Sequence, residues 1–224
     1  MRPDHRQITA ATRREKTRAR LVEAAVLAIA AKGPENVVIE DIVTGAGLSR
    51  GTFYTYYTQL EDALQDAKMT VVRELVALVL SAEPGVKDPA ESLASDLLTF
   101  VETFRRYPLL SQFHARMGRQ GGGPGSLVHE LMPDYLGWGI RTGRFCTMPM
   151  HLALEFIEAG MFNVMVHEIE GHPSHAEEAV AAILRVLGLP AQEAARLSQC
   201  KVAPLSAAED SLIARADRIR RASA

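Results

Sequence analysis

The chain has 224 residues, of which 47% are hydrophobic and 23% charged, and its two cysteines, Cys146 and Cys200, lie far apart. This composition is ordinary for a soluble protein, and the length suits one large or two modest domains with buried cores. No uncharged apolar run approaches the roughly 20 residues that cross a bilayer, and the charged start does not resemble a secretory signal. We therefore expect a cytoplasmic protein without a membrane partner, whose cysteines stay reduced.

The formal net charge of −2 is unevenly distributed along the chain. Residues 1–57 carry nine Lys/Arg and six Asp/Glu, a charge of +3, whereas the remaining residues carry −5. A basic front on an acidic body is typical of a protein that contacts phosphates with one end only.

Residues 1–11 show no apolar periodicity and are predicted to form a flexible basic arm. Thr12 and Glu15 have the spacing of a capping box, so the first helix is expected to begin there and to continue to Lys32, before a glycine. The short apolar run that follows predicts a second helix over residues 39–46.

The stretch 44–57 has the pattern of the turn and second helix of a helix-turn-helix. Two glycines allow the chain to reverse, because glycine reaches left-handed backbone angles without steric penalty. Ser49 is the expected N-cap of the next helix. Phe53 and Tyr57 lie four residues apart and share its buried face, while hydroxyl-bearing side chains occupy another face.

A long helix over residues 60–82 becomes more apolar toward its end, so it is expected to connect the small domain, residues 12–59, to a second core. The remaining sequence shows only helical patterns. Helices are predicted at about 89–107, 108–118, 126–142, 150–169, 175–187, 191–199 and 206–221. The fold class predicted from these patterns is all-α.

The helix over residues 150–169 is apolar on nearly every side, which is typical of a helix that is buried all round. Together with the next helix it can bury a second face against another copy of the chain, or it can be the core of a monomer. We expect a homodimer with these interface residues: Phe162, Met165, Val180, Ile183, Leu184 and Leu187.

Residues 13–65 resemble the DNA-binding domain of the tetracycline-repressor (TetR) family. The matching pieces are the basic first helix and four motifs: Ile39-Glu40-Asp41-Ile42, Ala46-Gly47-Leu48-Ser49, Gly51-Thr52-Phe53-Tyr54-Thr55-Tyr56-Tyr57 and Glu61-Asp62-Ala63-Leu64. The resemblance implies an N-terminal three-helix helix-turn-helix DNA-binding domain. It also implies that residues 83–224 form a larger helical domain that binds a small molecule and dimerises.

Carried over position by position, the resemblance implies that Thr52, Tyr54 and Tyr56 contact phosphates. It also implies that Arg50 and Thr55, together with Tyr56, face base edges in the major groove. The chemistry agrees, because arginine can pair bidentately with guanine and hydroxyl groups can bond to phosphate oxygens.

The chain departs from the family pattern at two positions. Leu60 stands where the family usually has a lysine that contacts phosphate, and Val38 stands where a threonine commonly caps the second helix. We expect three basic residues of the first helix to replace the missing phosphate contact: Arg13, Arg14 and Lys16.

Aromatic and methionine side chains of the later helices are candidates for lining an effector pocket, although core residues have the same composition. The principal candidates are Phe100, Phe104, Tyr107, Phe113, Met117, Trp138, Phe156, Met161 and Asn163. Further candidates are Tyr135 and Met165, with Glu102, His114 and Glu155 as polar groups that could orient a ligand.

His167, His172 and His175 crowd one turn together with two glutamates, and such side chains can bind zinc or nickel. Their spacing fits no standard ligand set, so a solvated polar loop is the preferred interpretation, and no metal or other cofactor is predicted. No catalytic motif stands out, so we do not expect an enzyme.

The sequence therefore predicts a homodimeric transcriptional repressor that binds a palindromic double-stranded operator and is released by a small apolar or aromatic effector. The alternative is a helix-turn-helix regulator without a small-molecule effector, which a protein partner controls or which acts constitutively. A cavity in the larger domain favours the first prediction.

Overall fold

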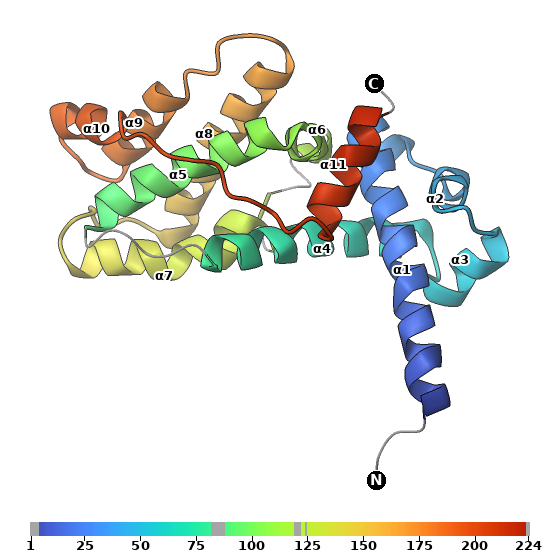
Figure 1. Ribbon diagram of the computed structural model, residues 1–224. Helices are drawn as coiled ribbons and strands as arrows, with labels where there is room; N and C mark the ends of the chain where they lie inside the picture. Colours follow the sequence, from blue (N-terminus) through green and yellow to red (C-terminus); the bar gives the residue numbers. More distant parts are fainter. Residues whose placement is uncertain (1–4, 82–87, 119–121, 124, 223–224) are drawn as a thin grey trace.

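The computed structural model describes residues 5–81, 88–118, 122–123 and 125–222, with side chains from residue 11 onward. Over these residues the all-α prediction is confirmed, with eleven α-helices, one 3-10 turn and no β-strand (Figure 1). None of the described helices has both the length and the apolarity that crossing a membrane requires. The elements are α1 (His5–Lys32), η1 (Pro34–Asn36), α2 (Ile39–Ala46), α3 (Arg50–Tyr56), α4 (Leu60–Leu80), α5 (Pro89–Arg106), α6 (Pro108–Met117), α7 (Leu127–Arg141), α8 (Met150–Ile169), α9 (Ala176–Val186), α10 (Ala191–Leu197) and α11 (Leu212–Ala222).

Helix α1 begins at His5 and not at Thr12, so the prediction of the helix start was wrong. No glycine or proline interrupts residues 5–32, so one helix continues through the predicted capping box. Residues 5–11, expected as a flexible arm, are therefore helical, and residues 1–4 lie outside the described residues.

Helices α1, α2 and α3 form a small unit at one side of the molecule, and the first turns of α1 project beyond it (Figure 1). Gly47 ends α2 with a left-handed backbone (φ 60°), and the Leu48 amide donates to the Val43 carbonyl oxygen at 2.8 Å. Ser49 caps α3 as predicted, since its hydroxyl oxygen accepts a hydrogen bond from the Thr52 amide at 3.1 Å. The reversal places α3 across the end of α2.

Helix α4 starts in the small unit and extends into the larger one (Figure 1). At the junction, the Tyr57 hydroxyl donates to the Asp66 carboxylate at 2.6 Å, and the Arg18 guanidinium pairs with the same carboxylate. Burial and the neighbouring carboxylate raise the pKa of Tyr57 above its usual range. The predicted end of α4 at Ala82 lies outside the described residues.

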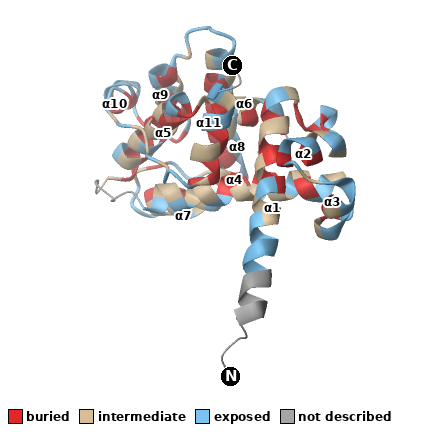
Figure 2. Ribbon diagram, turned by 45° about the vertical axis from the view of Figure 1, so that its right-hand side comes forward, coloured by how far each residue is buried: buried red, intermediate tan, exposed pale blue. Residues whose placement is uncertain are grey.

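Helices α5 to α10 build the larger unit, whose core is formed by the inner faces of α5, α8 and α9 (Figure 2). Helix α7 passes close to the turn that follows it, where a Cβ atom added to Gly139 would lie 1.9 Å from the Phe145 ring. Glycine is therefore required at this position. The predicted helix over residues 126–142 begins one residue later because Ser126 is its N-cap, accepting from the His129 amide.

The last helix starts later than predicted, at Leu212 and not at residue 206. Side chains of the fifth helix and of the residue after it hold the preceding segment in an extended conformation. The Leu205 amide donates to the Thr103 hydroxyl oxygen and the Ala207 amide donates to the Tyr107 hydroxyl oxygen, both at 2.9 Å. These amides are thus bonded to distant side chains, and a helix begins only beyond them.

Candidate functional site

Helix α3 has one face in the core and one on the surface. Phe53 and Tyr57 are 0% and 8% exposed and pack inside the small unit, as predicted. Arg50, Tyr54 and Thr55 are exposed, with 53% of the Tyr54 surface accessible. The outer face of α3 therefore carries a guanidinium group, a phenol and a hydroxyl.

Two threonines of α3 are held in place by hydrogen bonds within the helix. The Thr52 hydroxyl lies 3.0 Å from the Ser49 hydroxyl, and the Thr55 hydroxyl donates to the Gly51 carbonyl oxygen at 3.1 Å. Because its proton is used inside the helix, the exposed Thr55 side chain presents an acceptor oxygen and a methyl group outward.

The N-terminal turns of α1 adjoin the surface of α3. The Arg14 guanidinium lies 5.8 Å from the centre of the Tyr56 ring, a cation–π contact between the two helices. Arg13, Arg14 and Lys16 are exposed, and among the described residues no carboxylate forms an ion pair with them. Their charges are available to an external anion at the side of α3.

Two other basic residues of α1 are used inside the protein. Arg18 pairs with Asp66, and the Arg20 guanidinium donates to the Ala46 carbonyl oxygen at the end of α2. A cation at a helix C-terminus satisfies free carbonyl groups and interacts favourably with the helix dipole. Only the first turns of the basic helix thus remain for phosphate contacts.

The two departures from the family pattern have local explanations. The Val38 amide donates to the Asp41 carboxylate at 2.7 Å, so a side chain within α2 supplies one of its caps. A hydrogen bond from Lys32 holds the pKa of Asp41 below its usual value and keeps this acceptor charged. Leu60 is partly buried against the core and offers no charge to a phosphate.

A cavity of about 1310 Å³ lies in the larger unit, among helices α4, α5, α6, α7 and α8. Most of its wall is apolar, and the extended segment before α11 contributes Ala203 and Leu205. This volume exceeds the range of about 300–1,000 Å³ typical of drug-sized ligand sites. The cavity therefore has room for more than a single aromatic ring.

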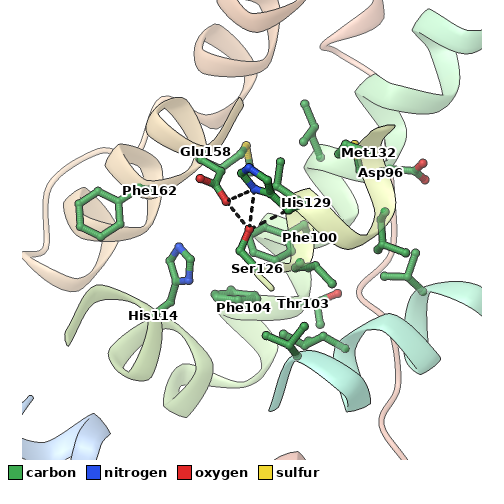
Figure 3. Close-up of a pocket in the computed structure, with 18 of the residues that line it drawn as sticks. Asp96, Phe100, Thr103, Phe104, His114, Ser126, His129, Met132, Glu158 and Phe162 are labelled. Carbon is green, nitrogen blue, oxygen red and sulfur yellow. Dashed lines mark hydrogen bonds and ion pairs between the residues drawn. The ribbon is translucent and has the colours of Figure 1, made fainter. Parts of the chain in front are cut away.

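A polar cluster stands on one wall of the cavity (Figure 3). The Glu158 carboxylate accepts hydrogen bonds from the Gly123 amide at 3.0 Å and from the Ser126 hydroxyl, and it lies 3.2 Å from His129 Nδ1. Buried Lys68 lines the same cavity; burial lowers its pKa, and the negative charge of Glu158 acts in the opposite direction. The cluster brings together residues from α4, α7, α8 and the loop before α7.

His114 projects into the cavity from α6 and is surrounded by aromatic rings (Figure 3). Its ring centre lies 5.9 Å from those of Phe104 and Phe162 and 6.5 Å from that of Phe100. Burial lowers the pKa of His114 to about 4, although the charge of Glu158 opposes this shift. At neutral pH the imidazole is therefore uncharged and presents one donor and one acceptor nitrogen.

The structure places most of the predicted pocket residues on the cavity wall, but not all of them. Those that line it are Phe100, Phe104, Phe113, His114, Met117, Tyr135, Trp138, Glu155, Met161 and Asn163. Phe156 is instead 51% exposed on the outer side of α8. Tyr107 is buried beside the cavity, where its hydroxyl holds the segment before α11, and neither Glu102 nor Met165 lines the cavity.

Sequence reasoning missed the polar cluster of the cavity wall. Glu158 is one of the few carboxylates on a mostly apolar helix, and this contrast could have identified it as a functional candidate. Ser126 and His129 have the spacing of a helix cap, so the sequence alone gives no reason to expect that both also contact Glu158. Lys68 carries no comparable signal, because a lysine on a long helix is usually solvated.

The predicted dimer residues are mostly buried inside the single chain. Met165, Val180, Ile183, Leu184 and Leu187 are at most 4% exposed because they form the packing between α8, α9 and the core. Phe162 lines the cavity beside His114. The five buried residues therefore provide no surface for a second copy. The large apolar side chains of the two helices that are exposed are Leu152, Phe156, Ile169 and Val186.

The histidine-rich turn shows no arrangement of ligands for a metal. The rings of His167 and His172 lie 6.2 Å apart, and among the described residues no group of three or more His, Cys, Asp or Glu side chains could hold an ion. Cys146 and Cys200 are free thiols.

A three-helix unit that exposes a capped recognition helix beside a basic helix, joined to a helical unit with a cavity, defines a helix-turn-helix transcriptional regulator. Residues 21–62 match the family model described as bacterial regulatory proteins, tetR family. The N-terminal unit of the chain is therefore a DNA-binding domain like that of the tetR family of bacterial regulators.

Solved structures with the same fold include a protein crystallised with and without a small-molecule ligand. A crystal structure of RolR without ligand is 29% identical, with a TM-score of 0.65, and the match covers 84% of this chain and all of that one. RolR in complex with resorcinol matches at 25% identity and a TM-score of 0.59, covering 88% of this chain and all of that one. A γ-butyrolactone receptor, an ArpA-like protein, shares the fold at 20% identity and a TM-score of 0.52, over 92% of this chain and 98% of its own. No curated protein sequence matches the chain significantly.

Proposed function

We propose that the protein is a homodimeric transcriptional repressor that binds a palindromic operator and is released by a neutral, hydroxylated aromatic effector. The observation that carries this proposal is the cavity beside α4, the helix that leads directly into the DNA-binding unit. A regulator without an effector has no need of such a cavity. A protein that binds chromosomal DNA acts in the cytoplasm, and we propose no catalytic role.

The chemistry of the wall supports an uncharged effector. Glu155, Glu158 and Asp96 line the cavity together with one buried lysine, and the imidazole of His114 is neutral at pH 7. An anionic ligand would meet more negative than positive charge here, whereas a phenolic hydroxyl can donate to the free acceptor of an imidazole or carboxylate.

The size of the cavity supports an effector larger than one ring. An engineered cavity of roughly 150 Å³ already accommodates benzene, and this cavity is several times larger. Resorcinol, the ligand in the RolR complex, is the appropriate first probe because that protein is a structural relative. Larger phenols with an apolar substituent should bind more tightly, since they bury more apolar surface.

In the proposed complex, α3 of each protomer enters the major groove, and the two half-sites lie about one helical turn or ~34–36 Å apart. Thr52, Tyr54 and Tyr56 contact phosphates, Arg50 and Thr55 face base edges, and the first turns of α1 add phosphate contacts.

Fluorescence anisotropy with a DNA fragment from the protein's own promoter tests the DNA part of the proposal. We expect affinity to fall steeply with salt, because phosphate contacts release counterions. Thr55→Ala should weaken binding by about five- to tenfold. Thr142→Ala is the matched control, because its hydroxyl makes the same type of bond, 3.0 Å from the Trp138 carbonyl oxygen. Thr142 follows α7, which belongs to the larger unit and not to the unit that contains α3 (Figure 1). Equal affinity of both variants would refute the assignment of Thr55.

Thermal shift with resorcinol, a bulkier alkyl-substituted resorcinol and benzoate tests the effector part. Stabilisation by the phenols and release of the DNA fragment are expected, whereas benzoate should have little effect. Stronger stabilisation by benzoate would overturn the proposed charge preference. If none of the three binds while DNA binding is intact, the regulator without a small-molecule effector becomes the better assignment.

A further inference from the structure

The extended segment that precedes α11 forms part of the cavity wall. Ala203 and Leu205 line the cavity, and the Leu205 amide is bonded to Thr103, another lining residue. The Ala207 amide is fixed by the Tyr107 hydroxyl at 2.9 Å. Residues 201–207 make no backbone hydrogen bond with one another, so side chains of the cavity domain determine their position.

The same segment continues into α11, whose start is fixed by α4. The amides of Leu212 and Ile213 donate to the Glu74 carboxylate at 2.8 and 3.0 Å. The first amides of a helix have no partner within the helix, and a carboxylate satisfies them and interacts favourably with the helix dipole. Glu74 of α4 thus caps α11 from outside.

The middle of α11 is bonded to α1 and α6. The Arg215 guanidinium pairs with Glu23 of α1 at 2.7 Å. The buried Asp217 carboxylate accepts from the Leu109 amide at the start of α6, at 3.1 Å. Figure 1 shows the segment crossing α5 and α11 lying between α6 and α1.

We propose that residues 201–222 are a mechanical link, additional to α4, that connects the effector cavity to the DNA-binding unit. This inference rests on the proposed function, in which the cavity binds an effector and α3 binds DNA. A ligand that displaces Leu205 moves a segment without internal hydrogen bonds, and the movement reaches α11. Because α11 is bonded to both α1 and α4, its displacement changes how these two helices, and therefore α3, are placed relative to each other.

Amide hydrogen exchange of the full-length protein, followed by mass spectrometry, tests the link without an effector or DNA. Tyr107→Phe removes the acceptor for the Ala207 amide. We expect exchange to become about fivefold faster not only in the segment but also in α11 and in α1 around Glu23. Tyr135→Phe, which removes a hydroxyl from the cavity wall on α7, is the matched control and should leave both helices unchanged.

If only residues 201–211 exchange faster in Tyr107→Phe, the segment loosens without affecting α11, and the link is refuted. If exchange accelerates throughout the protein, a second pair decides. Arg215→Gln should accelerate exchange in α1 around Glu23, whereas Arg218→Gln should not. Arg218 is exposed on the same helix, and within the described part of the chain its guanidinium donates to the Glu209 carbonyl oxygen and not to α1. Equal exchange in this pair refutes the proposal. Failure to bind DNA would instead count against the proposed function, since exchange requires no DNA.

Discussion

The environment of His114 determines whether its imidazole is neutral or protonated in the folded protein. Its neighbours are Phe100, Phe104 and Phe162, which cannot solvate a positive charge, so the pKa falls to about 4. In the unfolded chain an imidazole titrates near ~6.5. Between these two pKa values the unfolded chain binds more protons than the folded protein. The free energy of unfolding therefore increases as the pH rises through this window and decreases as the pH falls through it.

When the pH is lowered from 8 to 5, we expect the free energy of unfolding to decrease by about 2 kcal/mol because of His114. His114→Phe retains an aromatic ring but cannot ionise, so it should lose less stability over the same interval. Urea denaturation at the two pH values measures the difference. His172→Gln, at an exposed position, is the control and should behave as the wild type; an equally steep pH dependence in His114→Phe would contradict the assignment.

The hydroxyl group of Tyr57 stabilises the junction between the small unit and α4. Tyr57→Phe removes the hydrogen bond to Asp66, while the carboxylate keeps its ion pair with Arg18. Because the acceptor is charged and partly buried, we expect a loss of about 1.5–3 kcal/mol in the free energy of unfolding. Tyr54→Phe removes an exposed hydroxyl from α3, the helix that ends just before Tyr57, and should change stability by less than about 0.5 kcal/mol. Equal stability of the two variants would show that the Asp66 contact contributes nothing.

At the scale of the helices, features that depend on neighbouring residues could be predicted from the sequence. The N-cap at Ser49 and the proline that opens α5 act within one turn, so their residue types are sufficient evidence. The cluster of Ser126, His129 and Glu158 could not be predicted in this way, because it joins residues about thirty positions apart.

The delayed start of α11 illustrates the same limit. The sequence pattern predicts a helix from residue 206, but the amides of Leu205 and Ala207 are bonded to Thr103 and Tyr107, 102 and 100 positions earlier. Likewise, the apolar pattern of α8 indicates that the helix is buried but does not say by which copy of the chain. Only the fold assigns Met165 to the core of its own chain and Phe156 to the surface.

The cap of α3 yields a prediction that separates folding from DNA binding. Ser49→Ala removes the acceptor for the Thr52 amide and should cost about 1 kcal/mol of stability. Ser49→Asp keeps a capping acceptor and should preserve stability, but its charge should repel phosphates and weaken DNA binding. Thermal melts and anisotropy titrations of both variants measure the two effects. If Ser49→Asp binds DNA as the wild type does, the start of α3 does not approach the phosphates.

At the scale of the whole molecule, the proposed homodimer requires an exposed apolar surface on each copy. Leu152 and Phe156 lie one turn apart on the outer side of α8, and Val186 is exposed on the neighbouring α9. We propose these residues as the dimer contact, in place of the buried residues predicted from the sequence. An exposed phenylalanine next to other apolar side chains is the usual mark of such a contact.

Phe156→Glu should convert the dimer to a monomer at micromolar concentration and weaken operator binding by at least tenfold, because a charge is buried against an apolar partner. Ile169→Glu is the matched control, since it is also exposed on α8 but lies roughly 140° around the helix from Phe156. Sedimentation velocity of both variants decides the matter. A monomeric Ile169→Glu with a dimeric Phe156→Glu would move the interface to another face of the helix.

The ion pair between Glu23 and Arg215 closes a loop of 192 residues. During synthesis, α1 leaves the ribosome long before α11 exists, so the face of α1 that receives α11 remains uncovered while α2 to α10 form. Contacts of such large sequence separation form late in folding, because their loop-closure entropy must be offset by other contacts first. The DNA-binding unit therefore acquires its final surroundings in the last stage of folding, and incomplete nascent chains carry a helix-turn-helix that lacks one of its supporting helices.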